Sequence, residues 1–150
     1  MQIINTLCTK SNVLEILWDK NQNHLISFVS DKNPLCFNVI NALSNNYLFE
    51  EKSSGFQNGI QTIIFCENIN SIFIIDQSGK FINGYSIKEG NLICSLYRGN
   101  NPATITSLTA FNNDYLCITG STKTIHLFQI NNEKNEANND SWQNLFSLKV

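Results

Sequence analysis

The sequence contains the same short turn three times, and this repetition constrains its fold more than any other feature. The turns read Ser-x-Lys and lie at residues 30–32, 78–80 and 121–123, so the spacings are 48 (30 to 78) and 43 (78 to 121). Each turn separates two runs rich in β-branched and aromatic residues, which is typical of a β-hairpin. Three such hairpins indicate an internal structural repeat.

Aligning the three turns brings other positions into register. An apolar residue stands five positions before each serine, an aromatic residue seven positions after it, and an aliphatic residue two positions further on. These sets are Leu25, Phe73 and Leu116; Phe37, Tyr85 and Phe128; and Val39, Ile87 and Ile130. We therefore expect the members of each set to occupy equivalent places in three similar units.

Each hairpin is flanked by further β-rich runs. NVLEILWD, GIQTIIF and ATITSLTAF precede the three hairpins, and NYLFE and LICSLY follow the first two. Apolar residues in these runs alternate or cluster, and they do not recur at the spacing of a helix. Four short strands in each unit are the pattern of a β-propeller blade. The sequence therefore predicts an all-β, WD-repeat-like propeller with blades near residues 11–50, 56–98 and 103–150.

The number of units predicts an incomplete propeller. The chain supplies about three to three and a half blades, whereas a propeller closes with about four to eight. The open ends leave strand edges unpaired, and such edges aggregate or pair with another chain. Two explanations remain open, because the chain is either part of a larger propeller with blades missing here or a propeller that a second chain completes.

Composition argues against several functions. A net charge of −2 and a charged fraction of 15% disfavour a basic face that binds nucleic acid. The two histidines and the acids show no triad or metal-ligand spacing, and the seven glycines form no phosphate-cradling loop. We therefore expect neither an enzyme nor a bound metal or cofactor. The opening MQIINTLCTK lacks a secretory signal, and the five cysteines include no C-x-x-C pair, which favours a cytoplasmic protein with reduced, buried thiols.

The stretch from residue 96 onwards, LYRGNNPATITSLTAFNNDYLCITGSTKTIHLF, resembles a known family. This family is the PROPPINs, the WIPI-like seven-bladed propellers that bind phosphoinositides. Its signature is a Phe-Arg-Arg-Gly or Leu-Arg-Arg-Gly turn that leaves one blade, a Pro-Ala-Thr-Ile-like entry to the next, and a strand pair that ends in Thr-Val-His-Ile-Phe. The matching positions are Leu96, Arg98, Gly99, Pro102, Ala103, Thr104, Ile105, Ser107, Leu108, Thr124, His126 and Phe128.

The resemblance implies binding of phosphatidylinositol 3-phosphate, or of the 3,5-bisphosphate, at membranes in autophagy and endolysosomal traffic. It also implies a cytoplasmic protein that attaches peripherally to those membranes and has autophagy proteins as partners. The two arginines of the family serve two headgroup pockets, and Tyr97 replaces the first arginine here. Asp76, Lys80 and Asn83 stand where we expect serine, threonine and arginine. Because an aspartate repels phosphate, we expect the first pocket to be lost.

The second pocket is expected to remain, formed by Arg98, Thr104, Thr119, Thr124 and His126. Arg98 is the only arginine of the chain, and its planar guanidinium can bind two phosphate oxygens at once, which lysine cannot do. Thr124 and His126 are two residues apart on a strand and therefore share a face, which we expect Thr119 to share across the turn. Their hydroxyl and imidazole groups are suitable donors. Gly120 departs from the family, which has a hydroxyl residue there.

Simpler interpretations of these residues remain open. Arg98 next to Gly99 also fits a solvated turn, and His126 also fits an ordinary strand histidine. Propellers host many unrelated binding functions. The alternative to a lipid-binding protein is therefore a WD-repeat-like scaffold for protein interactions without lipid binding. The two hypotheses differ because only a lipid binder requires the 3-phosphate and Arg98.

The segment NNEKNEANNDSWQNLF follows the matching strand, where the family has a loop that inserts into the bilayer. Trp142, Leu145 and Phe146 are candidate membrane-contact residues, because their spacing suits one apolar face of a helical turn. The same residues fit the fourth strand of the last blade at least as well. The acids of this segment also oppose an anionic membrane.

Overall fold

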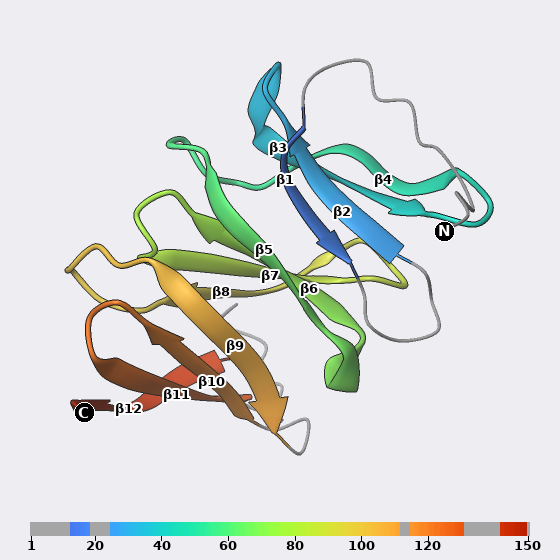
Figure 1. Cartoon of the computed structure of the whole chain (residues 1–150). Helices are drawn as coiled ribbons and strands as arrows, with labels where there is room; N and C mark the ends of the chain where they lie inside the picture. Colours follow the sequence, from blue (N-terminus) through green and yellow to red (C-terminus); the bar gives the residue numbers. More distant parts are fainter. Residues whose placement is uncertain (1–12, 19–24, 112–114, 131–141, 150) are drawn as a thin grey trace, which may run out of the picture.

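The three predicted units are three separate β-sheets in the computed structural model of the chain (Figure 1). The structure describes residues 13–18, 25–111, 115–130 and 142–149. In each sheet, four antiparallel strands are ordered as they occur along the chain. The prediction of an all-β fold built from propeller blades is therefore confirmed, with three four-stranded sheets in the described part of the chain.

The strands have the following bounds. The first sheet contains β1 (Val13–Trp18), β2 (Leu25–Ser30), β3 (Asn33–Asn41) and β4 (Asn46–Ser53). The second contains β5 (Ile60–Cys66), β6 (Ser71–Asp76), β7 (Phe81–Ser86) and β8 (Leu92–Tyr97), with the short 3-10 helix η1 (Glu67–Ile69) between β5 and β6. The third contains β9 (Ile105–Phe111), β10 (Tyr115–Gly120), β11 (Thr124–Ile130) and β12 (Trp142–Lys149).

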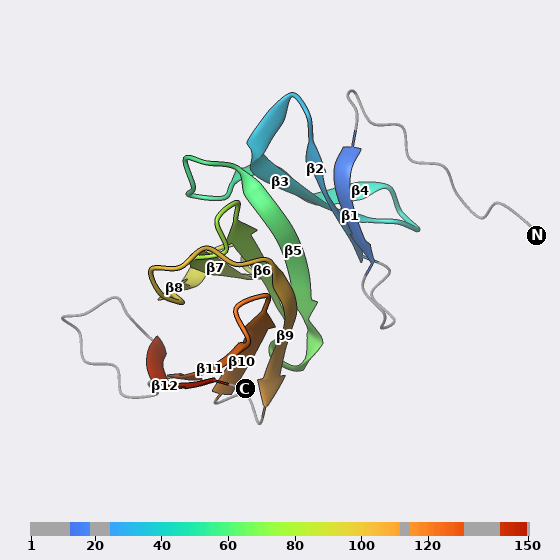
Figure 2. The ribbon, with the colours of Figure 1, turned by 60° about the vertical axis from the view of Figure 1, so that its left-hand side comes forward.

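The sheets follow one another as propeller blades do. Their first strands, β1, β5 and β9, lie next to one another, and the later strands of each sheet extend away from this line (Figure 2). Two apolar cores fill the spaces between the sheets. The core between the first and second blades contains Leu25, Val29, Phe37, Val39, Ile63, Ile72, Ile74 and Tyr85. The core between the second and third blades includes Phe73, Ile75, Ile82, Leu96, Leu108, Leu116, Ile118 and Phe128.

Strand β6 is buried at every position because the second sheet is covered on both faces. Successive side chains of a strand point to opposite faces. Ile72 and Ile74 therefore pack toward the first blade, and Phe73 and Ile75 pack toward the third. This explains why SIFIID contains a continuous apolar run before its final acid. A strand with one exposed face would instead alternate apolar and polar residues.

The equivalent positions of the three blades differ from those that the turns predict. Tyr85 and Phe128 face the preceding blade, but Phe37 faces the following blade and packs against Tyr85 with ring centroids 5.3 Å apart. The residue of the first blade that is equivalent to Tyr85 is Ile40. In each hairpin the second pair from the open end is Ile26–Ile40, Ile72–Tyr85 or Leu116–Phe128. The expected equivalence of Leu25, Phe73 and Leu116 is wrong for the same reason.

The difference arises because the three hairpin turns differ in length. They span residues 31–32, 77–80 and 121–123, and the first hairpin also contains an irregularity between Phe28 and Ser30. The correct alignment reveals a polar position that is buried in every blade. This position holds Asn38, Asn83 and His126, which are 6%, 9% and 6% exposed.

The three hairpin turns and the links between blades lie together at one end of the molecule, which we call the turn end. The links are residues 54–59 and 98–104. Backbone hydrogen bonds join them to the hairpins: Ser54 N to Leu35 O (2.9 Å), Gln77 N to Gly59 O (3.0 Å), Ala103 N to Ser78 O (2.9 Å) and Ser121 N to Thr104 O (2.9 Å). The turn end therefore contains both segments that the sequence associates with headgroup pockets.

Four cysteines fall within the described residues, and none of the four forms a disulfide. Cys66 and Cys94 are buried, whereas Cys36 and Cys117 are half-buried. Burial raises the pKa of the Cys94 thiol to about 12. Burial is confirmed for Cys66 and Cys94, the reduced state of the thiols stays a prediction, and Cys8 lies outside the described residues. No helix in the described part of the chain is long and apolar enough to cross a membrane.

Candidate functional site

Arg98 lies at the seam between the second and third blades. Its backbone N–H donates to Lys80 O at 2.8 Å, which holds the residue after β8 against the turn between β6 and β7. Its side chain is 5% exposed. Nε donates to Gly79 O at 2.7 Å, Nη1 donates to Thr122 Oγ1 at 3.3 Å, and Nη2 donates to Asn101 O. The guanidinium thus joins the hairpin turns of two blades to the link between them.

His126 and two threonines complete this cluster. His126 Nε2 lies 3.5 Å from Arg98 Nη1 and 3.0 Å from Thr124 Oγ1, and Thr124 Oγ1 lies 2.8 Å from Thr122 Oγ1. Burial lowers the pKa of His126, and the charge of Arg98 lowers it further. The imidazole is therefore neutral at neutral pH. In this state Nε2 accepts the hydrogen bond from the guanidinium.

The charge of Arg98 is met by neutral acceptors. Among the described residues, its hydrogen-bond partners are two carbonyls, a hydroxyl and an imidazole. Burial lowers the pKa of Arg98, and the field of Asp76 and the Tyr97 hydroxyl partly opposes this shift. A buried cation without a hydrogen-bonded counter-ion is electrostatically unfavourable. An anion that reached the cluster would therefore be stabilised there.

The structure brings together part of the predicted second pocket. Arg98, Thr124 and His126 are in contact, and the sequence missed their fourth member, Thr122. A signal for Thr122 was present, because it is the central residue of the third Ser-x-Lys turn and stands two positions before Thr124. The structure places it within hydrogen-bond distance of both Arg98 and Thr124.

Thr119 and Thr104 lie apart from the cluster. Thr119 is opposite Ile125, whereas His126 is opposite Ile118. Because residues directly opposite each other in a sheet share a face, Thr119 is on the other face from His126, and its hydroxyl lies 3.4 Å from Thr106 Oγ1. The expectation that Thr119 shares the face of Thr124 and His126 is therefore wrong.

Thr104 is exposed, and its backbone holds the third hairpin turn: its N–H donates to Ser121 Oγ at 3.0 Å, and its carbonyl accepts from Ser121 N at 2.9 Å. The same packing accounts for Gly120. A Cβ atom at this position would lie 2.6 Å from Thr104 O, which is too close for any side chain in this backbone arrangement. The absence of the family's hydroxyl residue at position 120 thus has a steric reason.

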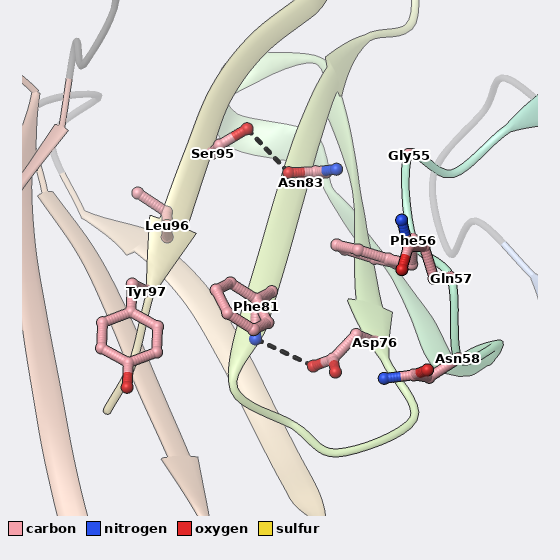
Figure 3. Close-up of a pocket in the computed structure, with 10 residues that line it drawn as sticks. All are labelled: Gly55, Phe56, Gln57, Asn58, Asp76, Phe81, Asn83, Ser95, Leu96 and Tyr97. Atoms are coloured by element: carbon pink, nitrogen blue, oxygen red, sulfur yellow. Dashed lines mark hydrogen bonds between the residues drawn. The ribbon is translucent and has the colours of Figure 1, made fainter. Parts of the chain in front are cut away.

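A pocket of about 580 Å³ lies between the first link and the second blade, at the place expected for the first headgroup pocket. Figure 3 shows the residues that line it: Gly55, Phe56, Gln57, Asn58, Asp76, Phe81, Asn83, Ser95, Leu96 and Tyr97. Lys80, which we expected here, is not one of them. The only ionisable carboxylate in this lining is Asp76, and the lining contains no cation.

The carboxylate of Asp76 is held by the turn that it precedes. It accepts hydrogen bonds from Lys80 N and Phe81 N, each at 2.8 Å, and from both the N–H and the hydroxyl of Ser78. Asn83 is likewise occupied, because its amide donates to Ser54 O at 2.8 Å and its Oδ1 accepts from Ser95 Oγ at 2.8 Å. These contacts stabilise the turn and the first link. The loss of an anion site here stays a prediction.

The candidate membrane-contact residues lie in a strand. Trp142, Leu145 and Phe146 belong to β12, which pairs with β11 along its length, so a helical turn at these residues is wrong and the fourth-strand interpretation is correct. The preceding loop, residues 131–141, lies outside the described residues, as does His24. Within the part of the chain that is described, no group of three His, Cys, Asp or Glu side chains could hold a metal ion.

Three blades of this kind define a β-propeller protein. No protein-family model matches the chain, and no curated protein matches it. Solved structures do match. Hsv2 of Kluyveromyces lactis superposes with a TM-score of 0.62 at 15% identity, over 79% of this chain and 39% of that one. Atg21, in a complex with the coiled-coil of Atg16, superposes with a TM-score of 0.58 at 20% identity, over 73% of this chain and 37% of that one.

A WD40 propeller is also similar. The WD40 domain of SCAP from fission yeast superposes with a TM-score of 0.68 at 10% identity, over 94% of this chain and 32% of that one. The chain thus spans less than half the length of these three proteins. Hsv2 and Atg21 are PROPPINs, so the resemblance seen in the sequence is confirmed at the level of the blade architecture.

Proposed function

We propose that this chain contributes to a propeller that binds the headgroup of phosphatidylinositol 3-phosphate, or of the 3,5-bisphosphate, through the cluster of Arg98, Thr122, Thr124 and His126. One observation carries the proposal: among the described residues, a buried guanidinium at the rim of two blades has only neutral hydrogen-bond partners. A phosphate dianion supplies the missing negative charge and accepts charge-assisted hydrogen bonds.

The route of a phosphate into the cluster follows from the contacts. Gly79 O binds Nε from within a tight turn, so the phosphate exchanges for the acceptors of the two Nη atoms, Asn101 O and Thr122 Oγ1. The hydroxyls of Thr122 and Thr124 then donate to the phosphate. Near this anion His126 gains a proton more readily, because a neighbouring negative charge favours the imidazolium.

The proposed protein binds membranes more weakly than a relative with two headgroup sites. Two linked sites raise the overall affinity through effective concentration, and one site lacks this gain. Tyr97 occupies the position of the first family arginine, and the pocket beside it has no cation in its lining. Restoring an arginine with Tyr97→Arg alone is expected to help little, because Asp76 and Asn83 still line that pocket.

The proposed place of action is the cytoplasmic surface of autophagic or endolysosomal membranes. The support is the shared blade architecture with Hsv2 and Atg21. Atg21 has been seen with the coiled-coil of Atg16, and on this basis we propose autophagy proteins as partners. Additional blades, either in a longer chain or from a second chain, are part of this proposal.

Vesicle co-sedimentation tests the proposal. We expect the chain to bind vesicles that contain the 3-phosphate lipid, to bind less as salt increases, and to lose about tenfold or more in affinity on Arg98→Ala, since charge-assisted hydrogen bonds contribute about 1.5–3 kcal/mol each. Lys88→Gln, an exposed charge between β7 and β8, serves as the matched control. Equal binding by the wild type and Arg98→Ala would exclude Arg98 as the phosphate-binding residue.

A protein-interaction scaffold is the second candidate, and a specific observation favours it. Arg98 already connects Gly79, Asn101 and Thr122, so its side chain also acts as a brace between blades. If this brace is its whole role, Arg98→Ala lowers the unfolding free energy while vesicle binding is absent in both proteins. Titration with soluble inositol 1,3-bisphosphate separates the two candidates, because a scaffold gives no heat of binding.

A further inference from the structure

We propose that the exposed aromatic pair of Phe81 and Tyr97, at the turn end, enters the headgroup region of an anionic membrane beside the Arg98 cluster. The two residues are a cross-strand pair of β7 and β8. Their ring centroids are 5.2 Å apart with an interplanar angle of 36°. This surface deepens the proposed function, because it supplies the membrane contact of the same site.

The pair is exposed in a way that packing within the chain does not require. Phe81 is 47% exposed and Tyr97 is 46% exposed, although their neighbours Ile82 and Leu96 are buried in the core. Tyr97 directly precedes Arg98 in the sequence, so the pair and the Arg98 cluster both lie at the turn end. The hydroxyl of Tyr97 donates to Asn100 Oδ1, which fixes the ring at the edge of the second link.

Both side chains suit the boundary between lipid and water. Phenylalanine supplies apolar area, and tyrosine combines an apolar ring with a hydroxyl that stays hydrated, which is why aromatic residues gather at membrane interfaces. Phe56, which is half-buried, extends the apolar surface into the adjacent pocket. The pair therefore offers a small apolar wedge and not a flat face.

Among the described residues, the hairpin turns and links of the turn end carry more cations than acids. The last residue of each Ser-x-Lys repeat is a lysine, so the turn end carries Lys32, Lys80 and Lys123 in addition to Arg98. Lys32 and Lys123 are exposed, and Lys80 is half-exposed. Two acids accompany them on the hairpin turns, Asp31 and Asp76, and the carboxylate of Asp76 is buried and bound by its own turn.

This combination of cations and aromatic rings favours a membrane over a protein partner. Basic residues near an anionic leaflet each gain affinity from its surface potential, and they do so without a fixed geometry. The three turn lysines belong to three different blades. Lysines so far apart suit attraction to the surface potential of a membrane better than a set of discrete ion pairs with one protein partner. The Ser-x-Lys repeat thus acquires a functional meaning in addition to its role in the turns.

Vesicle affinity of matched variants tests the proposal. Phe81→Ser with Tyr97→Ser removes the wedge, and Phe111→Ser is the control, because Phe111 is 61% exposed at the opposite end of β9. On phosphatidylcholine vesicles with phosphatidylserine and the 3-phosphate lipid, we expect a loss of about tenfold or more for the double variant and no loss for the control. For Lys80→Gln and Lys123→Gln we expect a loss of about fivefold each, which corresponds to about 1 kcal/mol per basic residue, and none for Lys88→Gln.

Further measurements separate this proposal from the proposed function. Inositol 1,3-bisphosphate should bind equally to the wild type and to the Phe81→Ser and Tyr97→Ser double variant, whereas Arg98→Ala should not bind it. If the wild type does not bind this headgroup, the proposed headgroup site is rejected and the aromatic pair is not. The contribution of the pair is then measured on vesicles that contain phosphatidylserine without the 3-phosphate lipid. Equal losses for the double variant and Phe111→Ser, or no loss for the double variant, overturn the wedge.

If the serine variants do not fold, Tyr97→Trp provides a direct readout. Its fluorescence should be quenched by brominated lipids more strongly than that of the wild type, which contains only Trp18 and Trp142. Equal quenching in vesicle-bound protein overturns the proposal and points to a protein partner for the pair.

Discussion

Gly79 is the position where a single added methyl group should most disturb the docking of two blades. It has a φ of +68°, and a Cβ atom there would lie 1.9 Å from the carbonyl oxygen of Ala103. Gly99 provides a matched control, because it lies on the second link (residues 98–104), which Gly79 contacts. Its φ is +140°, and no atom lies within 4 Å of a Cβ atom at that position.

The two substitutions to alanine differ mainly in what the new Cβ atom meets, since it clashes at position 79 and has open space at position 99. Both introduce a Cβ atom into a backbone conformation with positive φ, which costs about 1–2 kcal/mol. Gly79→Ala also forces the second link away from the turn, which costs about 1–3 kcal/mol for overpacking, and it breaks the hydrogen bond from Ala103 N to Ser78 O, worth about 1 kcal/mol. The expected loss is thus about 3–6 kcal/mol for Gly79→Ala and about 1–2 kcal/mol for Gly99→Ala.

Chemical denaturation of the two variants measures this difference in unfolding free energy. The loss at Gly79 should be accompanied by weaker headgroup binding, because the displaced turn carries Gly79 O, the acceptor that holds Arg98 Nε in place. Equal losses of unfolding free energy in the two variants would mean that the second link moves away from the added methyl group without a cost in free energy. The close contact of the second hairpin turn with this link would then contribute nothing to blade docking.

Two further predictions concern the buried polar position that recurs in the blades. The lowered pKa of His126 means that this residue binds a proton more readily in the unfolded chain than in the folded chain. The unfolding free energy should therefore rise with pH, with a slope of up to about 1.4 kcal/mol per pH unit. The rise should end at about pH 7, just above the ordinary pKa of 6.5. His126→Gln should reduce that slope; an identical slope in the wild type and the variant would contradict the assignment. Asn83→Ala should lower the unfolding free energy by about 1–3 kcal/mol because it removes the donor to Ser54 O, whereas Asn58→Ala, at an exposed residue, should change it by less than about 0.5 kcal/mol; equal thermal shifts would contradict this.

The sequence predicted the strands better than it predicted their register. Runs such as SIFIID and YLCITG identify strands because β-branched and aromatic residues cluster between polar turns. The face that each side chain takes depends on the length of the turn, and a difference of one residue moves every side chain to the other face. This is why Phe37 was aligned with Tyr85, although the structure packs the two rings against each other.

The candidate site shows the same limit. The spacing of Thr124 and His126 predicted their shared face correctly, because both lie on one strand and no turn intervenes. Thr119 was misplaced because the hairpin turn lies between it and Thr124, and the register across that turn cannot be read from spacing. Contacts between blades were also inaccessible, since nothing in the local sequence indicates that Arg98 reaches Gly79 and Thr122.

The position of Arg98 connects headgroup binding to the geometry of the blades. In the structure described here, its Nη atoms bind Asn101 O in the link and Thr122 in the third blade. A phosphate that takes these donors must break the contacts, so part of its binding free energy is spent on releasing the link. Stabilising the link without altering Arg98 should therefore weaken headgroup binding, and loosening it slightly should strengthen binding until the cluster itself is disordered. An arginine that braced the blades and had no ligand would show no such opposition between stability and affinity.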